Sequence, residues 1–193
     1  MSTPRWFTDT AEGHSEWYIE RFRTMAREGA DLAGEARLVD AMVGRNSRIL
    51  DAGCGPGRIG GYLHSVGHDV TGVDVDPKLI AAARQDHPGP RWIVQDLAEL
   101  DLDGTFDAIV CAGNVLVFVA EGTETTVLRN FRRHLTNDGF AIIGFHTNRG
   151  LTPDQLDVYA AEAGLRTDLR LATWDVKPWH DGADFAVTIL RPA

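Results

Sequence analysis

The chain alternates between segments in which apolar residues recur at helical spacing and short segments that are continuously apolar. Two helical patterns fall within the first 45 residues. From there on, further helical patterns alternate with five segments typical of buried strands: 47–50, 69–73, 91–95, 106–111 and 140–145. This alternation predicts a doubly wound α/β fold, a parallel sheet with helices on both faces.

The end of the chain follows a different pattern. Residues 152–155 combine a capping box with proline at the first helical position, which predicts a helix start. Residues 165–174 and 185–190 then alternate between apolar and polar positions, as expected for an antiparallel pair at one side of the sheet. Residues 137–139, Asn-Asp-Gly, predict a turn before the fifth strand. We expect a single domain over 1–193, with an N-terminal helical cap (1–45) and a ligand-binding core (46–193).

Composition narrows the possible partners. The 193 residues carry a formal net charge of −9, which argues against sequence-independent nucleic-acid binding and against an anionic membrane surface. No apolar run approaches the ~18 residues of a membrane span, and the first 17 residues lack the apolar stretch of a signal peptide. The two cysteines do not suggest a disulfide framework. We therefore expect a cytoplasmic protein that binds neither nucleic acid nor membrane.

Glycine is concentrated directly after the first predicted strand. Asp51 to Gly57 reads D-x-G-x-G-x-G, and Gly55, Gly57 and Gly60 also spell the G-x-G-x-x-G fingerprint of dinucleotide-binding proteins. Such a loop lets backbone approach a ligand closely. The glycines alone therefore leave two ligands open, a dinucleotide or another nucleoside-containing cofactor.

Acidic residues stand at the ends of the first three predicted strands. In a doubly wound sheet, ligands bind outside the carboxyl ends of the strands. Asp74 follows Asp51 by 23 residues, and a carboxylate there can accept both hydroxyls of a ribose. Asp96 could accept from an exocyclic amine, while the Leu97 amide donates to a ring nitrogen. The three acids beside a glycine loop therefore indicate a site for adenosine.

The segments "ILDAGCGPGRIG", "VTGVDVDPKLI", "WIVQDLAEL" and "FDAIVCAGNVLVF" resemble successive motifs of the class I S-adenosylmethionine-dependent methyltransferases. The resemblance spans roughly residues 35–191. It implies a sheet in the order 3-2-1-4-5-7-6 with the last strand antiparallel, and S-adenosylmethionine as methyl donor without a metal. It also implies the donor-binding residues, namely Asp51, Gly53, Cys54, Gly55 and Gly57 toward the methionine, Asp74 and Val75 at the ribose, Asp96 and Leu97 at the adenine, and Cys111, Ala112 and Asn114 at the sulfonium.

Two other functions stay open at this point. A nicotinamide-dependent oxidoreductase is disfavoured because Gly55 stands five residues beyond Leu50, whereas the fingerprint normally begins within a residue or two of the strand. Asp51 at the mouth of the loop would also repel a pyrophosphate and attract an ammonium group. A protein that binds S-adenosylmethionine without catalysis is the second alternative, because donor motifs do not prove an acceptor site.

The sequence says less about the acceptor. His146 directly follows the fifth strand and is the best candidate for a base or an acceptor contact, and Asn114 could orient donor or acceptor. The sequence around Asn114 is not the Asn-Pro-Pro-aromatic motif of amino-directed nucleic-acid methyltransferases, and no residues have metal-ligand spacing. We expect a small-molecule acceptor.

Aromatic residues are concentrated near the N-terminus and allow two interpretations. They could be core residues without a further role, or they could cover the donor and an apolar acceptor pocket as a lid. These residues are Trp6, Phe7, Trp17, Tyr18 and Phe22.

Overall fold

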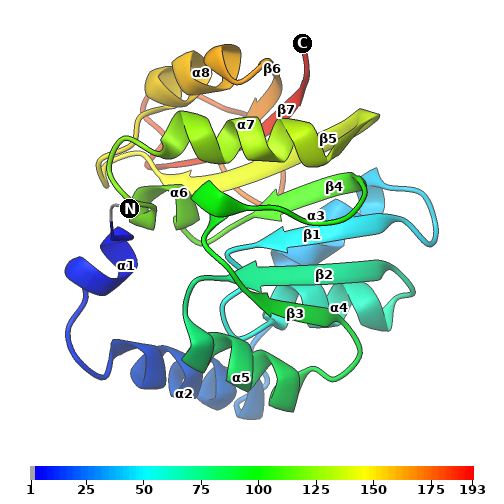
Figure 1. Ribbon diagram of the computed structural model, residues 1–193, viewed down its shortest axis with the longest axis vertical. Helices are drawn as coiled ribbons and strands as arrows, with labels where there is room; N and C mark the ends of the chain where they lie inside the picture. The colour runs from blue at the N-terminus through cyan, green and yellow to red at the C-terminus, as the bar shows by residue number, and fades with distance from the viewer. Residues whose placement is uncertain (1–2) are drawn as a thin grey trace.

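The computed structural model describes residues 3–193 (Figure 1). One seven-stranded sheet has the order β3-β2-β1-β4-β5-β7-β6, in which β7 is antiparallel to both of its neighbours. The predicted fold class and strand order are thereby confirmed. The strands are β1 (Arg48–Ala52), β2 (Asp69–Asp74), β3 (Arg91–Val94), β4 (Phe106–Cys111), β5 (Leu135–His146), β6 (Leu165–Leu171) and β7 (Phe185–Pro192).

Helices cover both faces of the sheet, as Figure 1 shows. One face carries α3 (Gly34–Met42), α4 (Arg58–Ser65) and α5 (Pro77–Asp86). The other carries α7 (Glu124–His134) and α8 (Pro153–Glu162). Successive strand residues point to opposite faces. Both faces are therefore buried, which explains the continuously apolar strands of the sequence.

The remaining helices lie near the carboxyl ends of the parallel strands, and Figure 1 shows α1 and the N-terminus at that edge. They are α1 (Arg5–Thr8), α2 (His14–Arg27), α6 (Val115–Phe118) and the 3₁₀ turn η1 (Leu97–Glu99). All except α2 have three or four residues, which is too short for an apolar period to reveal them.

Two strand predictions need correction. β1 extends to Ala52, so Asp51 lies inside the strand and Gly55 stands three residues beyond its end. β5 starts at Leu135, so the turn predicted at 137–139 is wrong. The register between β4 and β5 shifts near the start of β5. Phe106 pairs with Leu135, but Ala108, two residues further along β4, pairs with Phe140, five residues further along β5. The extra residues of β5 are accommodated in a bulge within the ladder.

Side-chain caps define two helix starts, of which the first was predicted at residues 152–155. The Thr152 hydroxyl accepts from the backbone N–H of Gln155, whose side chain accepts from the N–H of Thr152, a capping box that begins α8. Asp76 accepts from the N–H of Lys78 and begins α5 ahead of Pro77. Within residues 3–193, no helix is long and apolar enough to cross a membrane.

Candidate functional site

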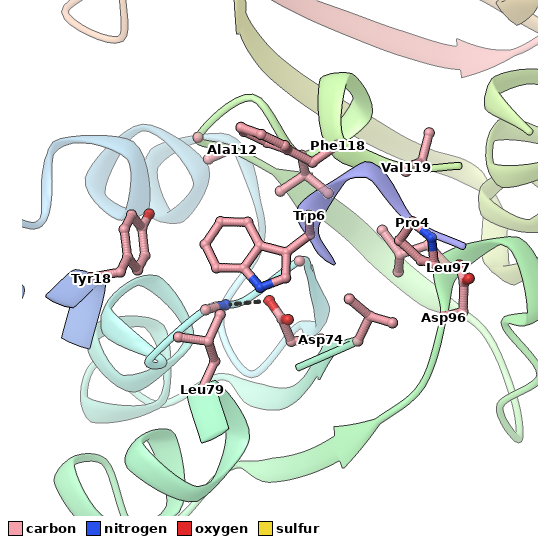
Figure 2. A pocket seen from close by; sticks show the side chains of 15 residues that line it. Pro4, Trp6, Tyr18, Asp74, Leu79, Asp96, Leu97, Ala112, Phe118 and Val119 are labelled. Atoms are coloured by element: carbon pink, nitrogen blue, oxygen red, sulfur yellow. Dashed lines mark hydrogen bonds between the residues drawn. The ribbon is translucent and has the colours of Figure 1, made fainter. Parts of the chain in front are cut away.

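A pocket opens at the carboxyl ends of β1 to β4, beneath the N-terminal segment (Figure 2). Seven of the predicted donor-binding residues line it: Gly53, Gly55, Asp74, Val75, Asp96, Leu97 and Ala112. Residues at the carboxyl ends of neighbouring parallel strands therefore line one pocket, as the sequence predicts.

The glycine loop passes too close to its surroundings for larger residues. Gly53 has a φ of +75°, and a Cβ on it would lie 2.4 Å from Val115 Cγ2. Gly57 has a φ of +87°, and its Cβ would lie 2.9 Å from that of Ala83. Both the positive φ and the contact exclude other residues at these positions. Gly53 faces the pocket, whereas Gly57 faces α5 and lies behind the lining.

Asp74 fixes the loop from the end of β2. Its Oδ2 accepts from the Gly55 N–H at 2.9 Å, and its Oδ1 accepts from the Asp76 N–H at 2.9 Å. Burial raises the pKa of Asp74 to about 6 in spite of these hydrogen bonds. The carboxyl group thus holds the loop and lines the pocket at the same time.

Asp51 does not stand at the mouth of the loop, contrary to the expectation from sequence. On β1 it shares the face of Ile49, which α4 covers, and only 1% of its surface is exposed. Its Oδ2 accepts from the Gly60 N–H at 2.8 Å, and burial raises its pKa to about 7. Asp51 therefore anchors the start of α4. Both sequence arguments against a dinucleotide are therefore weakened. Asp51 does not stand where it would repel a pyrophosphate, and Gly55 lies closer to the end of β1 than the sequence suggests.

Asp96 and Leu97 close the pocket beside β3. Asp96 Oδ1 accepts from the Ala98 N–H at 2.8 Å and caps η1. The side chain of Asn130, on α7, donates to the Leu97 carbonyl at 2.9 Å. These hydrogen bonds hold the two lining residues in a defined position.

Six of the predicted site residues lie outside the lining: Asp51, Cys54, Gly57, Cys111, Asn114 and His146. Cys54 packs beside Trp92, and Cys111 is fully buried on the α7 face. The backbone N–H of His146 donates to Asn114 Oδ1 at 2.7 Å, and its ring packs edge-on to Phe185. The assignment of His146 and Asn114 to catalysis stays a prediction.

The N-terminal segment contributes Pro4, Trp6 and Tyr18 to the pocket. In Figure 2 the Trp6 indole lies across the middle of the pocket, with Tyr18 on one side and Pro4 on the other. Trp6 Nε1 donates to Asp76 Oδ2 at 2.9 Å, and Ser15 Oγ donates to the same oxygen. Burial raises the pKa of Asp76, but the hydrogen bonds from Ser15 and Trp6 outweigh burial, so the pKa lies below its usual value.

Arg5 fastens the other side of this segment. Its Nε donates to the Val119 carbonyl at 2.9 Å, and its Nη2 lies 2.7 Å from Glu124 Oε1. Together with the Trp6–Asp76 hydrogen bond, these contacts attach α1 to both sides of the pocket, at the start of α5 and at the start of α7. Of the aromatic residues open to two interpretations, Trp6 and Tyr18 therefore belong to the pocket, whereas Phe7 and Trp17 are exposed.

The pocket also has an apolar wall for which the sequence predicts no function. This wall consists of Leu79, Val115, Phe118 and Val119. Such residues carry no sequence signal of their own, because apolar residues at helix starts are common in any core. Among residues 3–193, no three His, Cys, Asp or Glu residues are grouped so that they could hold a metal ion.

Comparison with known proteins identifies the family. A model of the methyltransferase domain matches residues 49–139. The solved structure of a TehB-like S-adenosylmethionine-dependent methyltransferase from Corynebacterium glutamicum is 46% identical, covers 95% of this chain and 100% of its own, and superimposes with a TM-score of 0.90. The chain belongs to the S-adenosylmethionine-dependent methyltransferases. The methyltransferase is thus an enzyme whose methyl donor is S-adenosylmethionine, and the oxidoreductase alternative is excluded.

Other relatives of the methyltransferase differ in their acceptors. A malonyl-[acyl-carrier protein] O-methyltransferase from Enterobacter lignolyticus is 28% identical over 89% of this chain and 72% of its own length. A magnesium-protoporphyrin O-methyltransferase from Rhodobacter capsulatus is 33% identical, but the match covers only 53% of this chain and 48% of that protein. The names of these two relatives specify different acceptors.

Proposed function

We propose that the adenosine of S-adenosylmethionine binds between Asp74 and Asp96. The observation that carries this proposal is the placement of both carboxyl groups in the lining of one pocket, at the ends of adjacent strands. Each Asp74 oxygen accepts one backbone N–H, and a carboxylate oxygen can accept a second hydrogen bond. Asp74, next to Val75, therefore accepts from the ribose hydroxyls, while Asp96 and the Leu97 backbone recognise the adenine.

The methionine part of the donor then lies over Gly53 and Gly55 and ends near Ala112. Gly55 offers little obstruction, since a Cβ there would be in ordinary contact with Tyr18, at 3.5 Å. Four predicted donor residues act from behind this surface in our proposal, because they shape the loop and the strand ends without lining the pocket: Asp51, Cys54, Gly57 and Cys111.

The acceptor is a small molecule without a negative charge in our proposal. Apart from the two carboxyl groups, the lining side chains are aromatic or aliphatic, and the described lining residues include no Lys, Arg or His. A negatively charged acceptor would find no cationic side chain among these lining residues to compensate for its lost hydration. The relatives named above for magnesium-protoporphyrin and for malonyl-[acyl-carrier protein] support only the general class, transfer to an organic acceptor.

Methyl transfer is an in-line displacement at the sulfonium. A lone pair of the acceptor forms the new bond to the methyl carbon, and the pair of the broken S–C bond stays on sulfur as a neutral thioether. Alignment of the two reactants can supply a large part of the catalysis. We propose that Asn114 and His146, which meet outside the lining, orient the acceptor, and that the His146 imidazole receives a proton that the acceptor releases.

The proposed function is tested by release of S-adenosylhomocysteine across matched acceptors. The panel pairs each neutral thiol, amine or phenol with an analogue that carries a carboxylate. We expect turnover with members of the neutral set and rates at least tenfold lower with their anionic partners. Turnover confined to the anionic analogues would contradict the proposed acceptor class. Loss of turnover in His146→Ala, with donor affinity unchanged, would support its acceptor-side role.

A further inference from the structure

Tyr18 reaches from α2 into the pocket between two loops of the core. Its Cε1 lies 3.5 Å from the position that a Cβ on Gly55 would occupy, and its hydroxyl lies 4.0 Å from the corresponding position on Gly113. Gly55 follows β1 and Gly113 follows β4. In Figure 2 the Tyr18 side chain stands beside the Trp6 indole at the edge of the pocket. The hydroxyl therefore lies where the methionine surface and the loop after β4 meet.

The Tyr18 hydroxyl has no hydrogen-bond partner within residues 3–193. The pKa of Tyr18 is raised, mainly by burial, while nearby charges have smaller effects in both directions. The hydroxyl therefore keeps its proton. Tyr18 is only partly buried and lines the pocket, and its hydroxyl is not among the buried side-chain atoms without a partner, so the hydroxyl is open to the pocket. Tyr18 packs in one cluster with Leu79, and the charges that act on its hydroxyl include Asp74 of the same lining. A group of a bound molecule can therefore take the place of water at this hydroxyl.

Packing holds the Tyr18 ring in place. Its ring lies edge-on to Phe22, with centroids 4.9 Å apart, and edge-on to Trp6 at 5.8 Å. Phe22 is covered in turn by the guanidinium of Arg58, which is ion-paired with Glu35. The hydroxyl is therefore presented on a fixed ring.

We propose that Tyr18 is a positioning residue that holds the positively charged end of the methyl donor, with its hydroxyl oxygen against the sulfonium and its methyl group. This inference rests on the proposed donor orientation, which brings the sulfonium to the Ala112 side of the pocket. A carbon bonded to S⁺ is polarised and makes C–H···O contacts with an oxygen lone pair. The neighbouring Trp6 ring adds an electron-rich face that favours a cation.

The arrangement discriminates between donor and product. S-adenosylmethionine carries a positive sulfur, whereas S-adenosylhomocysteine carries a neutral thioether and lacks the methyl group. Tyr18 therefore stabilises the bound donor more than the bound product. This difference restrains the methyl group before transfer and favours replacement of product by fresh donor.

Isothermal titration of both ligands against the wild type and Tyr18→Phe tests the inference. Tyr18→Phe keeps the ring and removes only the hydroxyl. We expect the dissociation constant of S-adenosylmethionine to rise about three- to fivefold, as for loss of one weak hydrogen bond, while that of S-adenosylhomocysteine changes less than twofold. Tyr159→Phe, on α8 outside the pocket lining, is the matched control and should leave both constants unchanged.

An equal change for both ligands, or no change for either, would overturn the role of Tyr18. A purely structural role predicts an equal change, because it does not distinguish the two ligands. If the wild type binds neither ligand, or if Asp74→Asn leaves their affinity unaltered, the proposed donor site itself fails. Melting temperatures of the variants establish that each is folded before the constants are compared.

Discussion

The site depends on carboxyl groups that are buried beneath or beside the ligand surface. Asp51 accepts from the backbone N–H of Gly60 in α4, and Asp74 accepts from that of Gly55 in the glycine loop. Burial raises both pKa values, to about 7 and about 6. The sequence predicts the importance of these acids, but it cannot show which carboxyl faces the ligand, because that depends on which face of the strand a helix covers.

Asp74→Asn tests the proposed ribose contact. The substitution keeps the size of the side chain but removes the charge and one acceptor. We expect S-adenosylhomocysteine to bind about 10- to 100-fold more weakly, since hydrogen bonds to charged groups contribute ~1.5–3 kcal/mol. Asp69→Asn, an exposed position at the opposite end of β2, is the control. Equal affinity in wild type and Asp74→Asn, measured by titration calorimetry, would remove Asp74 from the donor site.

Asp51 makes stability depend on pH in a defined direction. Its folded pKa of about 7 exceeds the unfolded value near 3.9, so burial of this carboxyl opposes folding increasingly as pH rises from 4 to 7. Asp51→Asn removes this titration. Between pH 5 and pH 8, we expect the free energy of unfolding of the variant, relative to wild type, to improve by about 2–3 kcal/mol. Denaturant unfolding at the two pH values measures it, and a constant difference would contradict the raised pKa.

At the scale of elements, α1 is held by side chains at both of its sides. It has four residues and none of them is buried. Arg5 ties it to Glu124 and Val119, and Trp6 ties it to Asp76. In Figure 2 the Trp6 indole lies across the middle of the pocket beneath, where the donor binds in our proposal. Donor exchange therefore requires α1 or the Trp6 side chain to move.

Weakening these contacts should speed ligand release. In Arg5→Ala and Trp6→Ala, we expect S-adenosylhomocysteine to dissociate at least threefold faster, because α1 opens more often. Phe7→Ala, on the same short helix but 47% exposed, should leave the rate unchanged. Stopped-flow displacement measures the rates. If all three variants release the product at the wild-type rate, α1 does not control exchange.

Elements with a long apolar period were predicted correctly, and short or irregular ones were not. The periods of α2, α4 and α7 and the capping box of α8 define those helices from local residues alone. By contrast, α1 and α6 have four residues each, and the bulge of β5 depends on pairing with β4. These features follow from tertiary contacts, which local patterns do not encode.

At the scale of the whole molecule, the order of strands and helices was sufficient to predict the fold. The sequence left open whether the N-terminal aromatic residues cover the pocket, because Trp6 and Tyr18 reach it only through the packing of α1 and α2 on the finished core. We propose that residues 1–193 act as a single domain, since the N-terminal helices α1 and α2 supply part of the wall of the site. The acceptor stays a proposal, because apolar walls carry no sequence motif.

The whole fold should gain stability from the correct cofactor. At about 100 times its dissociation constant, S-adenosylhomocysteine is expected to stabilise the protein by ~2.7 kcal/mol, while NADH at the same concentration leaves the melting temperature unchanged. A thermal-shift assay compares the two. Stabilisation by NADH alone would contradict the assignment of the pocket to the methyl donor.

A crystal structure with S-adenosylhomocysteine bound tests the central claim most directly. We predict the ribose hydroxyls within hydrogen-bond distance of the Asp74 carboxylate, the adenine against Asp96 and Leu97, and the thioether facing Tyr18. A nucleoside bound elsewhere, or in the reverse direction with its adenine over Gly53 and Gly55, would contradict it.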